Sequence, residues 1–216
     1  TEKFVVTKSP RSDVMYKTKQ LDKITKAGLK KNIFKSIGFN PSKKTILLTS
    51  HWTSRSNHRL FHDKIAASII RNFPNNQLII TSHPKLWQNP QIEYLINKRC
   101  KTPGFDTKLL KIAFERFSLK PNVNLQLNID PIDLLPFMEV CISDYSSVIL
   151  DSVFFYIPTI NRARGHMFDI EIEDLISNSG STFLGLQDLN EKINNYLKDP
   201  KMHKSGREKM VDKFIY

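Results

Sequence analysis

Short runs of β-branched and other apolar residues recur along this chain, and each precedes a polar loop and then a helical pattern. Thr45–Thr49 and Gln77–Thr81 are continuous apolar runs with the length and composition of buried strands. Val140–Ser143 is a third such run, and a helical apolar pattern begins at about Val148. Strands that alternate with helices favour a doubly wound parallel sheet, because right-handed crossovers place helices on both faces. We therefore expect a Rossmann-like α/β fold of about five strands.

The other segments extend this pattern without an internal repeat or a low-complexity tract. The further elements that we expect are strands at Phe4–Thr7, Val123–Leu127 and Pro158–Ile160, and helices at Tyr16–Ile37, Pro131–Met138 and 186–216. We expect one domain over 1–216, with 186–216 as a C-terminal helical extension.

The composition indicates a folded protein with an anionic partner. The 216 residues carry a formal net charge of +12 and are 40% hydrophobic, which excludes a disordered tail. Lysines are spread along the chain among acidic residues, without an aromatic and basic motif for nucleic acid, so a nucleic-acid-binding module is the less favoured alternative. Cys100 and Cys141 lack metal-ligand spacing and indicate a reducing compartment, so we expect a cytoplasmic protein. No apolar run is long enough to span a membrane.

The turn after the third apolar run carries the strongest functional signal. Ser143 and Asp144 end that run, and Ser146 and Ser147 precede the helix. Free backbone amides and the positive end of the helix dipole at such a turn bind anions, and both serine hydroxyls can donate to a phosphate. The structural alternative is that Asp144 or Ser146 only caps the helix. Asp151, inside an otherwise apolar helix, needs a partner and favours the functional interpretation.

Polar residues also follow the other two apolar runs. Ser50, His51 and Trp52 come after the first run, and His83 comes after the second and immediately before Pro84. The proline holds the histidine in one orientation, so its imidazole can meet a diphosphate oxygen. Trp52 either lines the pocket for a base or sugar or packs in the core.

Two further groups leave alternatives open. Arg11 can bind a phosphate bidentately, or it can pair with Asp13 across a predicted turn at Ser9–Asp13. His58 and His62 have the spacing of metal ligands on a helix but no third ligand. Because no P-loop or D-x-D motif is present, we expect no metal site.

The stretch Asp133–Ser147, followed by Asp151 and Pro158, resembles the D-x-L-L…D-x-x-I-[ST]-D-Y-S-S…D…P signature of the CDP-glycerol glycerophosphotransferases of teichoic acid and capsule synthesis. Further pieces agree with that family in order: Pro10–Asp13, Ile46–Trp52, His83–Pro84 and Phe168–Asp169. The resemblance covers roughly Pro10 to Asp169. Lys8, Thr53 and Thr81 depart from the family pattern, so CDP-ribitol remains an alternative donor.

The resemblance implies the C-terminal, donor-binding half of a GT-B fold. The N-terminal acceptor half is not represented, so the isolated chain should bind the donor without activity. The implied reaction transfers polyol phosphate from CDP-glycerol or CDP-ribitol to a growing teichoic acid or capsule polymer and releases CMP. His83 is then the catalytic residue, and no cofactor is obligatory, although Mg²⁺ is compatible with the diphosphate. The implied donor-binding residues are Arg11, Ser50, His51, Trp52, Ser143, Asp144, Ser146, Ser147 and Asp151.

The positive charge agrees with these implications. The acceptor would be a polyanionic or lipid-linked polymer, and an anionic membrane surface would attract the basic chain. We thus expect a peripheral protein on the inner face of a bacterial cell membrane. The alternative within the same fold is a GT-B glycosyltransferase or epimerase that uses a UDP-sugar.

Overall fold

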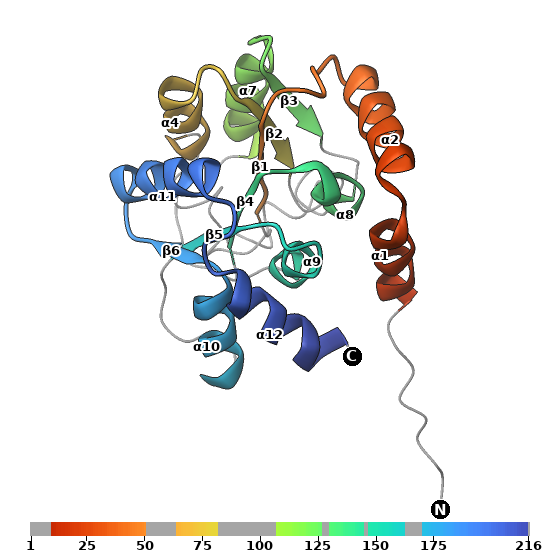
Figure 1. The fold of residues 1–216 in the computed structure, drawn as a ribbon. Helices are drawn as coiled ribbons and strands as arrows, with labels where there is room; N and C mark the ends of the chain where they lie inside the picture. The colour runs from red at the N-terminus through yellow and green to blue at the C-terminus, as the bar shows by residue number, and fades with distance from the viewer. Residues whose placement is uncertain are drawn as a thin grey trace, which may run out of the picture.

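The computed structural model describes residues 10–50, 64–81, 107–126, 130–144, 147–162 and 170–215. Their strands form one parallel sheet in the order β3-β2-β1-β4-β5-β6 (Figure 1). The strands are β1 (Thr45–Leu48), β2 (Gln77–Thr81), β3 (Val123–Gln126), β4 (Val140–Ser143), β5 (Thr159–Arg162) and β6 (Ser181–Phe183). The helices are α1 (Pro10–Gln20), α2 (Lys23–Ser36), α4 (Lys64–Asn72), α7 (Thr107–Ser118), α8 (Pro131–Leu134), α9 (Val148–Phe154), α10 (Ile170–Ser179), α11 (Leu186–Lys198) and α12 (Lys204–Ile215), with a 3-10 turn η1 (Leu135–Phe137). The predicted doubly wound α/β sheet is confirmed.

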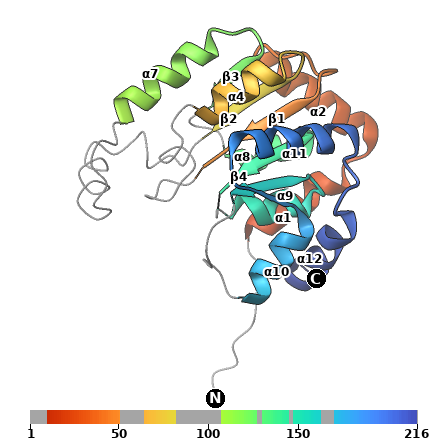
Figure 2. The ribbon, with the colours of Figure 1, turned by 90° about the vertical axis from the view of Figure 1, so that its left-hand side faces the viewer.

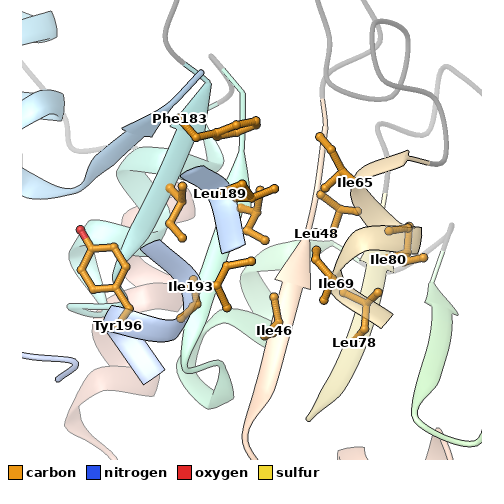
Figure 3. Packing of buried hydrophobic residues seen from close by; sticks show 14 of the residues in the cluster. Ile46, Leu48, Ile65, Ile69, Leu78, Ile80, Phe183, Leu189, Ile193 and Tyr196 are labelled. Atoms are coloured by element: carbon orange, nitrogen blue, oxygen red, sulfur yellow. The ribbon is translucent and has the colours of Figure 1, made fainter. Parts of the chain in front are cut away.

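One face of the sheet packs against α4, α7 and α11. Every second residue of a strand points to this face, as Ile46 and Leu48 of β1 do. Ile69 of α4 and Ile193 of α11 meet them in the largest core cluster (Figure 3). The predicted C-terminal helices are confirmed, and α11 contributes to this core through Leu189, Ile193 and Tyr196.

The opposite face packs against α2, α8 and α9. Leu47 and Cys141 alternate with the residues of the first cluster and meet Phe34 of α2 and Val148 of α9. Figures 1 and 2 show α4, α7 and α11 on one side of the sheet and α1, α2, α8 and α9 on the other. Both faces are therefore covered, as the continuous apolar strands require.

Several boundaries differ from the sequence predictions. The predicted turn at Ser9–Asp13 is wrong for its described part, since Pro10–Asp13 opens α1. Proline has no donor to lose in a first helical turn, so it starts this helix without penalty. The expected Tyr16–Ile37 helices are confirmed as part of α1 and as α2, and Gly38 follows with a positive φ of 74°. Phe4–Thr7 lies outside the described residues.

Differences also occur in the second half of the chain. The helix expected at Pro131–Met138 is α8 followed by the 3-10 turn η1, because Pro136 cannot donate to a continuing α-helix. The expected strand at Pro158–Ile160 is β5, which extends to Arg162. A sixth strand, β6, pairs with β5 and was missed, because three residues give too short a pattern.

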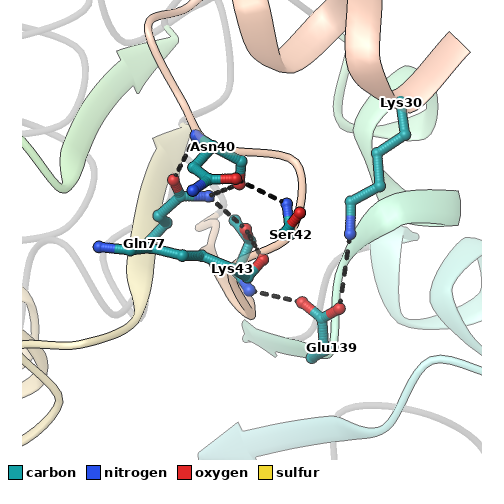
Figure 4. Close-up of polar contacts among 7 residues, drawn as sticks. Lys30, Asn40, Ser42, Lys43, Gln77 and Glu139 are labelled. Atoms are coloured by element: carbon teal, nitrogen blue, oxygen red, sulfur yellow. Dashed lines mark hydrogen bonds and ion pairs between the residues drawn. The ribbon is translucent and has the colours of Figure 1, made fainter. Parts of the chain in front are cut away.

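Hydrogen bonds join the loops at the amino edge of the sheet (Figure 4). The buried amide of Gln77 accepts from the Asn40 N–H at 2.7 Å and donates to the Asn40 carbonyl at 3.0 Å. Glu139 accepts from the Thr45 N–H at 2.5 Å and lies 3.7 Å from the ammonium of Lys30. These contacts hold the start of β1 and β2, and they lie at the edge opposite the predicted site.

The C-terminal helices close the side of the sheet that carries β5 and β6. α12 packs against α9 and α10, and Arg207, only 1% exposed, donates to the carbonyls of Met202 at 2.7 Å and Pro200 at 2.8 Å. Nη1, the nitrogen that donates to Met202, also donates to the carbonyl of Ser179 at the end of α10, at 3.3 Å. In the described part of the chain, no helix is long and apolar enough to cross a bilayer.

Candidate functional site at the carboxyl edge of the sheet

The carboxyl ends of β1 and β4 bring two predicted site residues together. β1 and β4 are neighbours in the sheet, and the Thr49 N–H continues their pairing to the Ile142 carbonyl at 2.9 Å. The next residue, Ser50, donates its hydroxyl to Asp144 Oδ2 at 2.5 Å. Both side chains are almost fully buried. The expectation that Ser50 and Asp144 meet at this edge is confirmed by their hydrogen bond.

The turn after β4 leads into α9 with an available hydroxyl group. The N-cap residue of α9 is Ser147, whose side chain is exposed and makes no capping hydrogen bond. The alternative that Asp144 serves as N-cap is therefore wrong in this structure, because Asp144 holds Ser50 and Ser147 occupies the cap. Ser147 and the first amides of α9 present donors at the positive end of a helix. Such an arrangement suits an anion.

Asp151 and Cys141 lie beneath this turn. Asp151 is 6% exposed in the first turn of α9, where a negative charge is favourable to the helix dipole. Burial is the largest cause that raises the pKa of Cys141 to about 12, and the nearby carboxyl groups of Asp151 and Asp144 act in the same direction. A hydrogen bond with Ser152 acts in the opposite direction and lowers this pKa. The thiol is thus protonated at neutral pH, which excludes Cys141 as a nucleophile.

Ser143 and Asn161 form a buried polar pair, of which only Ser143 is a predicted site residue. They are register partners near the carboxyl ends of β4 and β5, and both are at least 95% buried. Neither the Ser143 hydroxyl nor the Asn161 amide has a hydrogen-bond partner among the described residues. Asn161 was missed because the predicted strand ended at Ile160. The signal that could have identified it is a polar residue near the carboxyl end of a buried strand, where ligands bind in open α/β sheets.

The other predicted site residues cannot be placed from the described part of the chain. His83, His51, Trp52 and Ser146 lie outside it, as do His58 and His62. Arg11 lies in the first turn of α1, but its side chain is not described. Within the described ranges, no group of three His, Cys, Asp or Glu residues has the arrangement of a metal site.

Comparisons with known proteins identify the fold. No family model matches the sequence. No curated protein matches it either. Among solved structures, the wall teichoic acid polymerase TagF aligns with a TM-score of 0.61 and 18% identity over 95% of this chain and 45% of TagF. The glycosyltransferase WaaG of lipopolysaccharide biosynthesis aligns with a TM-score of 0.54 and 13% identity over 89% of this chain and 47% of WaaG.

A third similar structure is a complex of Staphylococcus aureus TarM with fondaparinux, α-GlcNAc-glycerol and UDP. It aligns with a TM-score of 0.54 and 13% identity over 80% of this chain and 33% of TarM. The chain thus spans half or less of the length of the structures that it matches. At these identities the likeness concerns the fold, and the fold is that of the C-terminal half of a GT-B protein.

Proposed function

We propose that this chain is the donor-binding half of a polyol-phosphate transferase related to the CDP-glycerol glycerophosphotransferases. It would bind CDP-glycerol or CDP-ribitol and transfer polyol phosphate to a teichoic acid or capsule polymer, with release of CMP. The observation that carries this proposal is the β4–α9 turn. Asp144 is hydrogen-bonded to Ser50 and does not cap α9, and the N-cap residue Ser147 makes no capping hydrogen bond. The Ser147 hydroxyl and the first amides of α9 can therefore donate to an anion. The fold likeness to TagF, one structure of which was soaked with CDPG, supports the same donor class.

Each residue of the proposed site meets one demand of the reaction. An acceptor hydroxyl attacks the β-phosphorus of the donor, the bond from that phosphorus to the CMP oxygen breaks, and the acceptor loses its proton. Ser146, Ser147 and the α9 amides would neutralise the diphosphate. His83 would donate to the leaving CMP phosphate, either as an imidazolium or through its N–H. The proton acceptor for the attacking hydroxyl would come from the other half of the GT-B fold.

The remaining donor-site residues would position the nucleotide. Arg11 would pair with the diphosphate, and His51 and Trp52 would line the pocket for the cytosine or ribose. Asp151 would accept hydrogen bonds from ribose hydroxyls. The buried residues Ser143, Ser50 and Asp144 would hold the turn in position without contacting the donor. The predicted acceptor is a polyanionic or lipid-linked polymer, bound between the two halves.

A second candidate, a GT-B glycosyltransferase that uses a UDP-sugar, is favoured by one observation. The TarM structure, which shares this fold, contains UDP. Diphosphate binding at a helix N-terminus serves both kinds of donor, so the described turn is compatible with either nucleotide. The nucleobase pocket separates the two candidates.

Calorimetry with CDP-glycerol, CDP-ribitol, CMP and UDP-N-acetylglucosamine tests the proposal. We expect binding of the CDP-polyols and weaker binding of CMP, which lacks the β-phosphate. Preference for UDP-N-acetylglucosamine would replace this proposal with the glycosyltransferase. Failure of all four ligands would reject a nucleotide-donor site in this chain.

Substitutions of Ser147 locate the diphosphate. Ser147→Ala removes one charge-assisted hydrogen bond and should reduce affinity by about 1.5–3 kcal/mol. Ser147→Glu adds bulk and a negative charge, so it should abolish donor binding while the melting temperature stays the same or rises through the dipole interaction. Normal donor binding by Ser147→Glu would show that the diphosphate lies elsewhere.

A further inference from the structure

A chain of hydrogen-bonded side chains joins β6, α11 and the start of α12. The hydroxyl of Tyr196 on α11 lies 2.9 Å from the hydroxyl of Ser181 on β6 and 2.8 Å from Nδ1 of His203. The rings of Tyr196 and His203 also pack against each other, with centroids 5.8 Å apart. Tyr196 is 1% exposed, whereas His203 is exposed and immediately precedes α12. A buried hydroxyl is thus bonded to an imidazole that can be protonated from the solvent.

The backbone at His203 is held in an unusual conformation. Its φ of 58° lies in the left-handed region, which residues other than glycine rarely adopt. The Arg207 N–H donates to the His203 carbonyl at 3.1 Å, which is the first hydrogen bond of α12. A conformation of this kind persists only where the surrounding structure enforces it. The contact between Tyr196 and His203 therefore helps to fix the point at which α12 begins.

The hydrogen bonds of this chain are complete when the imidazole of His203 is neutral. The Tyr196 hydroxyl then donates to Nδ1 and accepts from the Ser181 hydroxyl. Protonation makes Nδ1 a donor, so Tyr196 has to accept from it and to donate to Ser181 instead. The Ser181 hydroxyl then loses the acceptor that it has in the neutral state. Protonation of His203 thus reverses the whole chain of hydrogen bonds and leaves one donor to be satisfied elsewhere.

The charges around His203 oppose its protonation. Partial burial of the ring, followed by the charge of Arg207, lowers the pKa of His203. Tyr196 supplies no compensating anion, because burial raises the pKa of its hydroxyl. β6 carries no charged residue. The other charged side chains of the adjoining elements balance in sign: Asp188 and Lys192 on α11, Asp199 and Lys201 on the connection, and Lys204 and Glu208 on α12.

The position of α12 depends on the connection that ends at His203. Arg207, in the first turn of α12, donates to the carbonyls of Pro200 and Met202 in this connection. Farther along, α12 packs against α9 and α10 through an apolar cluster that includes Met210. A shift of the connection would therefore disturb the buried cation and the apolar packing together.

We propose that the protonation state of His203 controls the docking of α12: the neutral imidazole, bonded to Tyr196, holds α12 in place, and protonation weakens its packing against α9 and α10. This proposal does not rest on the proposed transferase reaction. Because the pKa of His203 is lowered in the folded protein, the stabilisation is fully present above the ordinary pKa of 6.5. It is lost as the pH falls through the folded pKa.

Hydrogen exchange of the full chain tests this proposal. The protection of the α12 amides, corrected for intrinsic exchange rates, should be several-fold lower at about pH 5.5 than at about pH 7.5, and linkage limits the change for one imidazole to about tenfold. Protection in α2, measured in the same samples, should change less, because the expected opening is local. The wild-type imidazole of His203 should titrate below 6.5 by NMR.

His203→Asn is the matched variant. Asparagine tolerates the left-handed backbone, and its amide oxygen can accept from Tyr196, but it does not titrate. Its α12 should therefore keep the same protection at both pH values. Tyr196→Phe removes the hydroxyl that holds the imidazole, so it should lower the protection of α12 at about pH 7.5 as well.

Four outcomes would overturn the proposal. They are equal protection of α12 in the wild type at both pH values, an equal loss in α2, an equal loss in His203→Asn, and titration of His203 at or above 6.5. Unchanged protection in Tyr196→Phe would likewise reject the hydrogen bond as the cause. Because these measurements use no nucleotide, their failure leaves the donor-binding proposal intact.

Discussion

At the scale of single residues, the buried polar groups divide into those that are hydrogen-bonded and those that are not. Gln77 is buried and bonded through both ends of its amide. Asn161 is equally buried, yet neither of its amide atoms has a partner in the described structure. A buried amide without partners loses its hydration and recovers nothing, so these two residues should respond oppositely to apolar replacement.

Asn161→Leu replaces the unpaired amide with an apolar group of nearly the same shape. We expect the free energy of unfolding to rise by about 1 kcal/mol, because the unpaired polar atoms disappear. Gln77→Met is the matched control and should lower it by about 1–3 kcal/mol, because it leaves the Asn40 N–H and carbonyl without their partner. Urea denaturation measures both. A loss of stability in Asn161→Leu would mean that the amide is satisfied in solution.

At the scale of elements, the amino ends of β1 and β4 are joined through a carboxyl group. Glu139 accepts from the N–H that starts β1 and lies beside Lys30 of α2. Burial raises the pKa of Glu139 above its ordinary value of 4.5, and it outweighs the Thr45 hydrogen bond and the charges of Lys30 and Lys44, which lower it. The folded protein therefore binds a proton here more tightly than the unfolded chain does.

This pKa shift predicts a pH dependence with a definite sign. Because the folded pKa is raised, the contribution of Glu139 to stability is fully present below pH 4.5 and is lost as the pH rises through the folded pKa. In Glu139→Gln this loss is absent, so the variant should gain stability relative to the wild type from acid to neutral pH. Denaturation curves across this range measure the difference. A fall in the stability of Glu139→Gln relative to the wild type as the pH rises would contradict the sign.

At the scale of the whole molecule, α12 closes the sheet beside β5 and β6 through close backbone contact. Gly206 lies where a side chain would overlap the carbonyl oxygen of Asn178 at the end of α10. The adjacent Arg207 is held by the carbonyls of Ser179, Met202 and Pro200. The packing of α12 on α10 thus depends on two consecutive residues, the glycine at 206 and the buried cation Arg207.

Gly206→Ala should lower the free energy of unfolding by about 3 kcal/mol, because backbone on both sides must move. Gly28→Ala is the control, since nothing lies within 4 Å of a methyl group there. In the interior of α2 it should raise stability by about 1 kcal/mol through helix propensity. Thermal denaturation of both variants checks the pair, and equal melting temperatures would contradict the proposed contact.

Local patterns in the sequence were sufficient for most elements. Val140–Ser143 and Gln77–Thr81 are strands with the predicted bounds, because continuous apolar runs of this length need burial on both faces. The strand–turn–helix at the β4–α9 turn also follows from local periodicity and polar turn residues. The roles assigned to His83, His51, Trp52 and Ser146 remain predictions, since these residues lie outside the described structure.

Contacts between distant segments were decided by the tertiary structure alone. Ser50 and Asp144 are 94 residues apart, and their hydrogen bond exists because β1 pairs with β4. Composition cannot reveal that pairing, since any two buried strands look alike in sequence. The pairing of Ser143 with Asn161 has the same origin. Periodicity reports which face of an element is buried, whereas strand order and register follow from how all the elements pack together.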